Sequence, residues 1–500
     1  YCVYTDEHRN GFFGEDCAKQ LLDDLVNKYG TYKKSEEVEL VYKHKKSLKL
    51  IAHNAGYDFR FLLKHLYSVD TIEKSNSIMS CNALAYNGEY VLSLKISCSL
   101  KMINMPLRKF GKCFNLDVKK EIMPYSLYTE ENVKINNLDI NYCLSFVDKK
   151  DKDEYLENCR RWGCIKDDKI DILRYAGEYC YMDCITLKNG YETFQKLVDE
   201  ATGQNINDYL TLASMADDYL KKNGCYDNVF QISGVPRHFI QNCVVGGRCM
   251  TSQNKKHKRM NCKISDFDAV SLYPSAMNRM DGFLQGRPKV IKNFEPEKYD
   301  GYFIKIKITK IKKEYNFPCA SVLTDDGIRD FTNDLVDEEV YMDKVGLEDF
   351  INFQGVEYEF IMGYYYDEGR NEKIKETMRH LFNQRLKFKK EKNPIQMVFK
   401  ELMNSSYGKS FMKPIETEKQ YIKKSNWETF LERNYNNIRT AVELPNEKMI
   451  RVETIKTIDT HFNNVHIGVE ILSMSKRIMY EVMTLAEDKK YNMYITDTDS

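Results

Sequence analysis

The sequence predicts a multidomain protein of mixed α/β and α+β class. Its 500 residues exceed what a single hydrophobic core usually serves, so about two to four domains are expected. Strands and helices alternate in residues 1–190, whereas residues 281–370 predict short strands between turns and residues 371–411 predict two helices. A hydrophobic fraction of 42% and a charged fraction of 30% are ordinary for a globular chain and argue against disorder.

The net charge and the cysteine content limit which partners and which cellular compartment are expected. The 75 basic and 74 acidic residues leave a net charge of +1, so a nucleic-acid partner must be argued from local patches. No run reaches the roughly 18 apolar residues of a membrane span, and the N-terminus lacks a signal pattern, so no membrane partner is expected. The 15 cysteines include no Cys-x-x-Cys pair, which predicts reduced thiols in a soluble, intracellular protein rather than disulfides or a zinc site.

The first 190 residues contain a strand-to-helix junction that carries two polar residues four apart. A strand is expected over residues 47–52, and the helix after it presents one apolar face. That face consists of Phe59, Leu62, Leu63 and Leu66. Asn54 and Asp58 lie at the junction itself. They are either a helix cap or a functional pair, in which Asp58 binds a metal and Asn54 holds a substrate strand.

A second helix of this region begins near Tyr179 and places Tyr179 and Asp183 on one face. Such a pair is common by chance, so it is considered only together with Asp58. Between the two helices a strand is expected over residues 90–96, and Ser99 and Leu100 follow it, where they could simply turn the chain. The next stretch is basic and is either a phosphate contact or a solvated surface; its basic residues are Arg108, Lys109, Lys112, Lys119 and Lys120.

Residues 191–265 are expected to join two parts of the protein. Helices are predicted over residues 191–201 and 211–220, and Gly246-Gly247-Arg248 then interrupts the pattern. Adjacent glycines permit positive φ and a close approach of the backbone to a phosphate chain, with an ordinary bulge as the alternative. The basic run 255–259 is interpreted as a contact to a nucleic-acid backbone or as a charged loop.

Residues 264–280 predict a strand, a turn and a helix. The strand covers residues 264–267, and the helix starts near Pro274, a favourable residue for a first helical turn. Asp268 then lies at a strand end, where a metal ligand is held rigidly, and Tyr273 is close enough to pack on whatever the metal holds. The residues that follow predict an accessory subdomain with a period-two strand over residues 303–308.

A helical hairpin is predicted over residues 371–411. An Asn-Pro pair separates two helices with apolar periodicity, and two helices across a short break should pack antiparallel. Eight basic and two acidic residues give a local net charge of +6 over residues 381–413. Lys400, Asn404 and Tyr407 are expected on one face of the second helix, where a cation, an amide and an aromatic ring could hold a triphosphate and stack a base.

The last part of the chain predicts a mixed insert over residues 412–450, a long helix over residues 470–486 and a strand over residues 491–496. The helix is expected to bury Ile471, Met474, Ile478 and Val482. The strand delivers Asp497 and Asp499, whose side chains would share one face and could bind one divalent cation, with a solvated turn as the alternative.

Three of these segments together resemble sequence motifs of the family B DNA polymerases. Asp268-Ala-Val-Ser-Leu-Tyr-Pro274 is similar to motif A, Lys400-Glu-Leu-Met-Asn-Ser-Ser-Tyr-Gly408 to motif B, and Thr496-Asp-Thr-Asp-Ser500 to motif C. Their order and separations suit that family, and most closely its protein-primed branch of bacteriophages, linear plasmids, viruses and organelles. The three motifs in combination are highly specific.

The resemblance implies an RNase H-like 3′–5′ exonuclease domain, followed by the palm and fingers of a right-hand polymerase without the thumb. It implies the following domains: residues 1–190 as the exonuclease-like domain, 191–280 as linker and first part of the palm, 281–370 as an insertion like terminal protein region 1, 371–411 as the fingers hairpin, 412–450 as an insertion like terminal protein region 2, and 451–500 as the second part of the palm.

The resemblance also implies the chemistry of a polymerase site. Asp268 and Asp499 would bind two Mg²⁺ ions, with Mn²⁺ as an alternative, and Asp497 would be an auxiliary ligand. The implied nucleotide-binding residues are Tyr273 under the sugar, Asn404 and Tyr407 beside the nascent pair, and Lys400, Arg385 and Lys389 on the phosphates. The implied partners are a DNA primer-template, dNTPs and a terminal priming protein.

In the N-terminal half, Asn54 with Asp58 resembles the second exonuclease motif and Tyr179 with Asp183 the third, so Asp58 and Asp183 are implied metal ligands. The implied DNA-binding residues are Ser99, Leu100, Gly246, Gly247 and Arg248. Three departures stand out: the first exonuclease motif, Asp-x-Glu, is missing because Asp6-Glu7 has the wrong spacing; the Tyr of a Tyr-x-Gly-Gly element falls at Val244; and nothing follows Ser500. The sequence is therefore expected to be a fragment.

The predicted function is that of a DNA-directed DNA polymerase that adds dNTPs to a 3′-hydroxyl by a two-metal mechanism. Its expected role is protein-primed replication of a viral or plasmid linear genome, in the host cytoplasm or nucleus if viral, with an incomplete proofreading domain in this chain. The alternatives are a nuclease or repair protein with a vestigial polymerase half, and a non-catalytic module that binds nucleic acid.

Overall fold

The computed structural model describes residues 2–5, 8–32, 47–74, 77–118, 121–256, 261, 263–410, 412, 416–444, 449–457, 459 and 461–499. Asp6, Glu7, Lys119, Lys120 and the predicted basic residues 257–259 lie outside this set. The chain divides into two compact units: residues 1–211 with 417–455, and residues 212–416 with 456–500. No helix within the described ranges is long and apolar enough to cross a bilayer.

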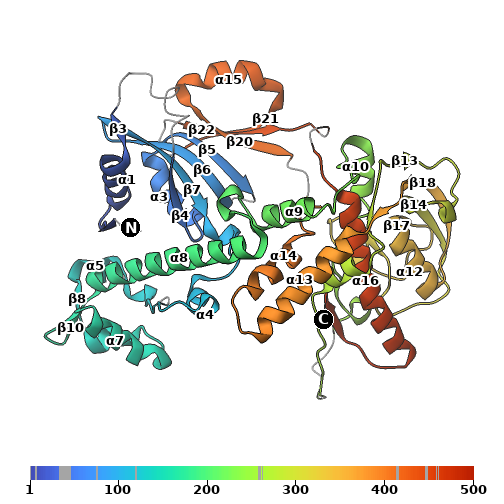
Figure 1. Cartoon of the computed structure of the whole chain (residues 1–500), viewed down its shortest axis with the longest axis horizontal. Helices are drawn as coiled ribbons and strands as arrows, with labels where there is room; N and C mark the ends of the chain where they lie inside the picture. The colour runs from blue at the N-terminus through green and yellow to red at the C-terminus, as the bar shows by residue number, and fades with distance from the viewer. Residues whose placement is uncertain are drawn as a thin grey trace. The chain divides into compact units, whose positions relative to one another are not determined.

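The first unit is built on a five-stranded sheet (Figure 1). Its elements are β3 (Thr31–Tyr32), β4 (Leu48–Ala52), β5 (Tyr67–Lys74), β6 (Ser77–Tyr86) and β7 (Tyr90–Cys98). The antiparallel order is β3-β7-β6-β5, and β4 pairs with β7 in parallel. Leu92, Leu94 and Ile96 alternate along β7 and are buried in the core, as the period of two requires. The strands predicted at 47–52 and 90–96 are therefore confirmed.

Helices cover this sheet and extend from it. Helix α1 (Cys17–Tyr29) packs on β6 and β7, and α3 (Gly56–Leu62) packs on β6 and continues into the 3-10 turn η1 (Leu63–His65). Phe59, Leu62 and Leu66 are buried, which confirms the predicted apolar face. The long helix α8 (Ile172–Thr202) starts at Asp171, whose carboxylate accepts a hydrogen bond from the Arg174 amide at 2.9 Å.

A small subdomain is inserted between β7 and α8 (Figure 1). Its sheet has the antiparallel order β8-β10-β9, and its core contains Tyr155 and Tyr175 with ring centroids 4.6 Å apart. The elements of this part of the chain are η2 (Ser99–Lys101), η3 (Leu107–Lys109), α4 (Phe110–Phe114), η4 (Tyr125–Leu127), α5 (Glu130–Ile135), β8 (Asn137–Asp139), α6 (Ile140–Ser145), η5 (Lys149–Asp151), α7 (Lys152–Arg161), β9 (Ile165–Lys166) and β10 (Lys169–Asp171). A hairpin of β1 (Cys2–Tyr4) and β2 (Arg9–Gly11) packs on α8.

Residues 417–455 belong to the first unit although they follow most of the second along the chain. They form an antiparallel sheet of order β20-β22-β21 with one covering helix. The elements are β20 (Thr417–Lys423), η9 (Lys424–Asn426), α15 (Trp427–Asn434), η10 (Tyr435–Asn437), β21 (Ile438–Glu443) and β22 (Met449–Ile455). β20 lies beside β5, where the Tyr421 hydroxyl donates to the Glu73 carboxylate at 2.8 Å, and Met449 joins the core of the large sheet.

The second unit contains a four-stranded antiparallel sheet of order β13-β18-β14-β17. Its strands are β13 (Lys289–Val290), β14 (Gly301–Lys310), β17 (Glu339–Asp343) and β18 (Glu357–Tyr366), and α12 (Lys344–Gln354) and α16 (Val465–Asp488) pack beside them. Ile304, Ile306 and Ile308 are fully buried, so the period-two strand predicted at 303–308 is confirmed. The remaining elements are α9 (Leu212–Lys222), α10 (Gly234–Gln241), β11 (Cys249–Thr251), η7 (Ser252–Asn254), α11 (Leu272–Arg279), β12 (Phe283–Leu284), η8 (Pro296–Lys298), β15 (Ser321–Leu323), β16 (Arg329–Phe331), β19 (Arg370–Asn371) and β23 (Ile495–Asp497).

The predicted helical hairpin is present as α13 (Lys373–Lys390) and α14 (Gln396–Ser405). The chain reverses at Lys392, which has a left-handed φ of 54°, and at Asn393, whose side chain accepts a hydrogen bond from the Ile395 amide at 3.0 Å. Phe388 and Phe399 stack between the helices, with centroids 5.7 Å apart and planes within 4°. Because α13 also packs on α11, the hairpin is joined to the segment that carries Asp268.

Four local expectations are wrong. The helix expected to begin near Tyr179 and the one expected over residues 191–201 are a single helix, α8. Residues 264–267 form no strand: Ile264 is 59% and Phe267 81% exposed, and Ala269 donates to the Asp499 carbonyl, one backbone bond that does not make a ladder. The last strand starts at Ile495 rather than Tyr491, because its partner β11 is only three residues long. On α16, Val482 is 65% exposed and not part of the core.

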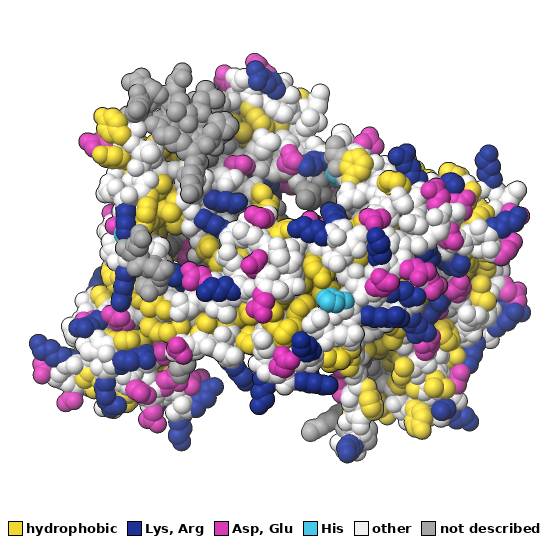
Figure 2. Space-filling model, viewed as in Figure 1, with side chains coloured by type: hydrophobic (Ala, Val, Ile, Leu, Met, Phe, Trp, Pro, Cys, Tyr) yellow, Lys and Arg dark blue, Asp and Glu magenta, His cyan; other side chains and the backbone are white. Residues whose placement is uncertain are grey.

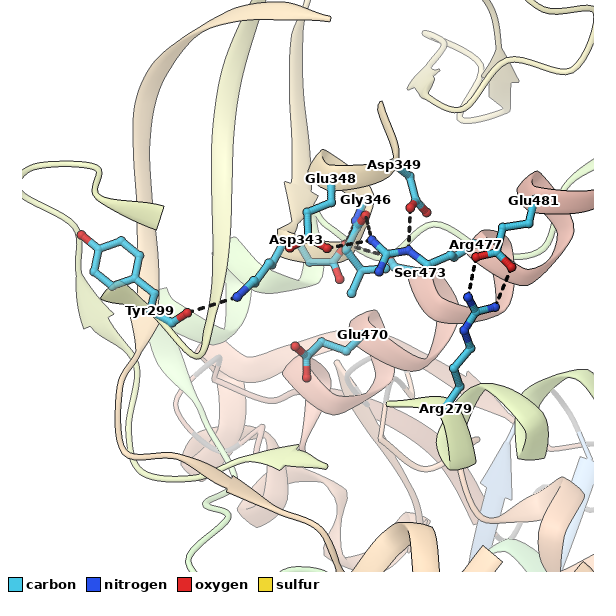
Figure 3. Close-up of polar contacts among 12 residues, drawn as sticks. Arg279, Tyr299, Asp343, Gly346, Glu348, Asp349, Glu470, Ser473, Arg477 and Glu481 are labelled. Carbon is cyan, nitrogen blue, oxygen red and sulfur yellow. Dashed lines mark hydrogen bonds and ion pairs between the residues drawn. The ribbon is translucent and has the colours of Figure 1, made fainter. Parts of the chain in front are cut away.

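A polar network fixes α16 against α12 (Figure 3). The Arg477 guanidinium donates to Asp349 at 2.6 Å, to Glu348 at 2.8 Å and to the Val345 carbonyl at 3.0 Å. Asp349 is 2% exposed, and burial raises its pKa to about 7 although the nearby Arg477 lowers it. The Arg477 charge thus stabilises the buried Asp349 carboxylate. Arg477 lies on α16, the helix that precedes the C-terminal aspartates.

Candidate active site and a second acidic cavity

The C-terminal aspartates lie on a short antiparallel ladder between β11 and β23. Cys249 pairs with Asp497, and the strand then ends, because Thr498 adopts a left-handed φ of 59°. The Thr498 amide donates to the Arg248 carbonyl at 2.8 Å, and the Asp499 amide donates to the Asp497 carbonyl at 2.7 Å. The two carboxylates therefore do not share a strand face as predicted; a tight turn separates them.

Gly247 makes this turn possible. A Cβ atom at Gly247 would lie 2.5 Å from the Thr498 side chain, a distance that real Cβ contacts do not reach. At Gly246 a Cβ would meet nothing within 4 Å. Packing therefore requires a glycine at 247, where the two chain segments approach each other closely beside Asp497. At 246 there is space for a side chain.

Asp268 is joined to this turn from a distant part of the sequence. The amide of Ala269 donates to the carbonyl of Asp499 at 2.6 Å, so the residue after Asp268 contacts the last described residue. Asp268 is exposed and Asp499 is half-buried. Ser271 then takes a left-handed φ of 51° and α11 begins. The structure therefore brings the backbones of the two predicted metal ligands together.

Two aromatic rings border the same region. Tyr273 in the first turn of α11 stacks on Tyr407, with ring centroids 4.2 Å apart and planes 22° apart. Burial raises the pKa of both phenols, and the Asp499 carboxylate raises each further, which places both rings within the electrostatic reach of Asp499. Because α14 ends at Ser405, Tyr407 lies in the following turn and not on the helix face predicted for it.

Of the three basic residues predicted to bind the nucleotide, Arg385 is held by a hydrogen bond, and Lys389 and Lys400 are exposed. The Arg385 guanidinium on α13 donates to the Ser271 hydroxyl at 3.0 Å, three residues after Asp268. Lys389, one turn along the same helix, is exposed, as are Lys400 and Asn404 on α14. A cation is therefore fixed near the acidic turn, and the lysine side chains remain open to solvent. On the face of the molecule in Figure 2, Lys and Arg side chains are interspersed with Asp and Glu, as the net charge of +1 suggests.

Arg248 corrects one expectation. It was predicted to contact DNA, but it is only 4% exposed. Its guanidinium donates to the Phe317 carbonyl at 2.9 Å and lies over the Tyr480 ring, 4.5 Å from the centroid. The side chain therefore anchors β11 in the interior of the second unit. The local sequence could not reveal that Arg248 is buried, because a Gly-Gly-Arg segment can occur both at a protein surface and against a core.

The donor atoms at the acidic turn suit a hard divalent cation. Carboxylate oxygens are the ligands that Mg²⁺ prefers, and Mg²⁺ commonly takes only one or two carboxylates and completes its shell with water and substrate phosphates. No group of three His, Cys, Asp or Glu side chains gathers around one point within the described residues. The residues present thus fit ions that bind together with a phosphate ligand.

A second acidic site lies in the first unit, in a cavity of about 780 Å³. Asp58 from α3 and Asp183 from α8 both line it, so the structure brings these two predicted residues together. Burial raises the pKa of Asp58 to about 6, and the Cys180 thiol adds to the increase. No side chain caps α3, so Asn54, with a left-handed φ of 70°, serves the turn and not a helix cap.

Tyr179 lies within the same unit and is 7% exposed. Its hydroxyl contacts that of Tyr125 at 2.9 Å, and burial together with Tyr125 and Asp183 raises its pKa. A protonated phenol beside Asp183 can donate a hydrogen bond to whatever that carboxylate binds. Tyr125, and Lys49 and Cys184 in the cavity wall, were not predicted as site residues, because nothing in their local sequence distinguishes them.

Ser99 corrects a second expectation. The resemblance implies that it binds DNA, but its side chain is 2% exposed. Its hydroxyl donates to the Ala52 carbonyl at 3.2 Å and lies 3.0 Å from His53 Nδ1, so it fixes the end of β4. Leu100 is partly buried against the core of the large sheet. Both residues thus support the strand that precedes Asp58.

Residues 41–493 match the model of one protein family, described as DNA polymerase type B, organellar and viral. Two curated proteins are similar in sequence. A probable DNA polymerase of Ascobolus immersus is 25% identical over 472 residues, which are 90% of this chain and 37% of that protein. A probable DNA polymerase of Neurospora intermedia is 25% identical over 390 residues, covering 73% and 39% of the two chains. The chain spans less than half the length of these relatives.

Solved structures of Phi29 DNA polymerase share the fold. The complex with primer-template DNA superposes with a TM-score of 0.58 at 18% identity, over 91% of this chain and 70% of that chain. The ternary complex with primer-template DNA and incoming nucleotide gives a TM-score of 0.59 at 17% identity, over 91% and 72%. The first unit and the second unit both fall within these matches, since 91% of the chain is covered.

Proposed function

The chain belongs to the organellar and viral type B DNA polymerases, and we therefore propose that it adds dNTPs to the 3′-hydroxyl of a DNA primer under the direction of a template strand. Its fold combines an RNase H-like exonuclease domain with the palm and fingers of a right-hand polymerase. The observation that carries the proposal is the contact between the Asp268 segment and Asp499, with the Tyr273–Tyr407 stack beside it.

We assign metal binding to Asp268 and Asp499, with Asp497 as an auxiliary ligand, for two Mg²⁺ ions or Mn²⁺ in their place. Such ions, when bound, lower the pKa of the primer hydroxyl and offset the charge of the triphosphate. The protein's own contribution is to hold the carboxylates: the Ala269–Asp499 hydrogen bond and the turn at Thr498 keep them at fixed places on the backbone.

The hairpin residues would bind the nucleotide. Arg385 is held by Ser271 close to Asp268, and Lys400 and Lys389 are exposed cations on the facing helices, so the three can offset the charge of the β and γ phosphates until pyrophosphate leaves. The Tyr273 ring would lie under the sugar and exclude a 2′-hydroxyl. Tyr407, which stacks on it, and Asn404 would flank the nascent base pair.

The cavity of the first unit would carry a 3′–5′ exonuclease activity. Asp58 and Asp183 would be its metal ligands, Tyr179 would donate a hydrogen bond near the scissile phosphate, and the exposed Asn54 would contact the strand being trimmed. The close backbone approach at Gly246-Gly247 would suit a passing phosphate chain. Among the remaining segments, residues 371–411 would be the fingers, and residues 281–370 and 412–450 would be insertions like terminal protein regions 1 and 2.

For the whole protein we propose protein-primed replication of a linear viral or plasmid genome, with primer-template DNA, dNTPs and a terminal priming protein as partners. The support is the family and the phage polymerase fold. Such a protein would act inside the host cell. A priming assay with a terminal protein and each labelled dNTP in turn, scored by covalent transfer of label to protein, separates this role from ordinary primer extension.

Primer extension tests the polymerase assignment directly. We expect Asp499→Asn to reduce nucleotide incorporation by roughly a thousandfold, because the loss of one metal ligand costs several kcal/mol of transition-state stabilisation. Asp266→Asn, on the exposed segment just before Asp268, is the matched control and should retain activity. Undiminished incorporation by Asp499→Asn would refute the assignment.

A further inference from the structure

One thiol lies against the acidic turn. Cys249 pairs directly with Asp497 across the β11–β23 ladder, and its Sγ donates to Asp497 Oδ1 at 2.8 Å. The Thr498 hydroxyl is 3.6 Å from the same sulfur. We propose that Cys249 is a positioning residue of the polymerase site, which orients the Asp497 carboxylate through this hydrogen bond. The inference rests on the proposed function.

The hydrogen bond has a short, rigid path between its two ends. Directly opposite residues of an antiparallel pair have Cβ atoms about 5 Å apart, so no flexible segment separates the thiol from the carboxylate. A carboxylate is the stronger partner for a weak S–H donor, because the charge assists the bond. This hydrogen bond favours the Asp497 rotamer that brings Oδ1 to the thiol at the end of β23.

The strand that carries the thiol is itself anchored in the interior. Arg248, the residue before Cys249, donates to the Phe317 carbonyl and is 4% exposed. The Lys476 ammonium donates to the Val245 carbonyl at 2.6 Å, three residues before Arg248. Buried groups therefore fix the backbone on which the donor lies.

The exposure of this thiol needs a reason. Among the described cysteines with placed side chains, Cys249 alone is exposed, and the others are buried or half-buried. An exposed thiol carries a cost in reactivity and contributes little to packing. A hydrogen bond to a proposed metal ligand is a role that the position of Cys249 on β11 makes possible.

Two measurements on the full chain test the proposal: single-nucleotide incorporation at varied Mg²⁺, and Mn²⁺ binding followed by electron paramagnetic resonance, which should weaken by the same factor. We expect Cys249→Ala to raise the Mg²⁺ concentration for half-maximal rate about three- to tenfold, because groups that orient a metal ligand typically change metal affinity by at least this much. Cys249→Ser retains a donor and should stay within about threefold of the parent. Cys113→Ala, at a half-buried thiol of α4, is the control and should not change the Mg²⁺ requirement.

A double-mutant cycle separates positioning from general destabilisation. If Cys249 acts through Asp497, Cys249→Ala should have no further effect on the Mg²⁺ requirement in an Asp497→Ala background. Equal effects in both backgrounds, or an unchanged Mg²⁺ requirement in an active Cys249→Ala protein, would overturn the inference. A parent protein that extends no primer at any Mg²⁺ concentration would instead refute the proposed function, so the two failures are distinguishable.

Discussion

Asp58 lowers the stability of the folded protein when its partly buried carboxyl group is charged. Its carboxyl group is partly buried in the wall of the first unit's cavity, and burial raises its pKa from 3.8 to about 6. Because the folded pKa lies above the unfolded one, the stability that this group contributes is present below about pH 4. That stability is lost as the pH rises through 6, where the folded state must carry the charge.

Replacement by an uncharged isostere should therefore stabilise the protein at neutral pH. We expect Asp58→Asn to raise the free energy of unfolding by about 1 kcal/mol at pH 8 and by little at pH 4, allowing for partial solvent access. Urea unfolding in EDTA at both pH values measures this, and EDTA excludes stabilisation by a bound cation. A variant that is less stable than the parent at pH 8 would show that the Asp58 carboxylate is stabilised by its surroundings.

At the scale of single residues, the sequence predicts which residues belong to a site better than it predicts which side chains are buried. The roles of Asp268, Tyr273 and Arg385 follow from the resemblance of the motifs. In the structure the residue after Asp268 contacts Asp499, Tyr273 stacks on Tyr407, and Arg385 contacts Ser271. Arg248 and Ser99 were predicted to face DNA and instead are buried. Which side of a strand faces the core depends on its neighbours across the sheet, which local sequence does not contain.

Helix α16 shows how a single element organises the second unit. It is held to α12 by Arg477, which contacts the buried Asp349, and to α11 by a bidentate ion pair between Arg279 and Glu481 (Figure 3). The two arginines differ in environment. The Arg477–Asp349 pair is buried on the carboxylate side, whereas the Arg279 and Glu481 side chains are 44% and 43% exposed.

This difference predicts unequal losses of stability. Arg477→Met should lower the free energy of unfolding by about 3 kcal/mol, because it leaves a buried carboxylate without its counter-charge. The loss should be larger at pH 8 than at pH 5, since the Asp349 carboxyl can take up a proton at the lower pH. Arg279→Met, the matched control, should cost under about 1 kcal/mol. Urea denaturation at the two pH values distinguishes them, and equal losses would contradict the argument.

Elements built from local periodicity were predictable, and those that depend on distant partners were not. The hairpin of α13 and α14 follows from apolar spacing and an Asn-Pro break within some 30 residues. Residues 264–267 have the composition of a strand but form none; the one backbone bond to Asp499 is made by Ala269, two residues later. The length of β23 was likewise overestimated, because its limit is set by β11, which lies more than 240 residues earlier in the chain.

At the scale of the whole molecule, the chain crosses between its two units three times, after residues 211, 416 and 455. Residues 417–455 complete the first unit by placing Met449 in its core and Tyr421 on Glu73, a residue whose side chain is 7% exposed. The sequence predicts more than one unit, but the predicted domains are consecutive segments, whereas the first unit is made of two segments far apart in the chain. The return of residues 417–455 depends on contacts that no local pattern encodes.

Residues 1–211 alone should accordingly be less stable than the same residues joined to 417–455 by a flexible Gly-Ser linker. We expect a difference of about 3 kcal/mol, from the lost burial of Met449 and from Glu73, which would keep no Tyr421 partner. The urea midpoint of the two polypeptides measures it, with the linker alone appended to residues 1–211 as the control. Equal midpoints would mean that residues 417–455 contribute nothing to the first unit.

The return of residues 417–455 also sets an order of events during synthesis. The ribosome makes the 205 residues from 212 to 416 before the missing strands of the first unit emerge. At about 5–20 residues per second, the large sheet must wait on the order of 10–40 s with its β5 side uncovered. A nascent chain of this design exposes that side of the sheet for the whole interval, so slow codons between residues 212 and 416 should lower the yield of native protein.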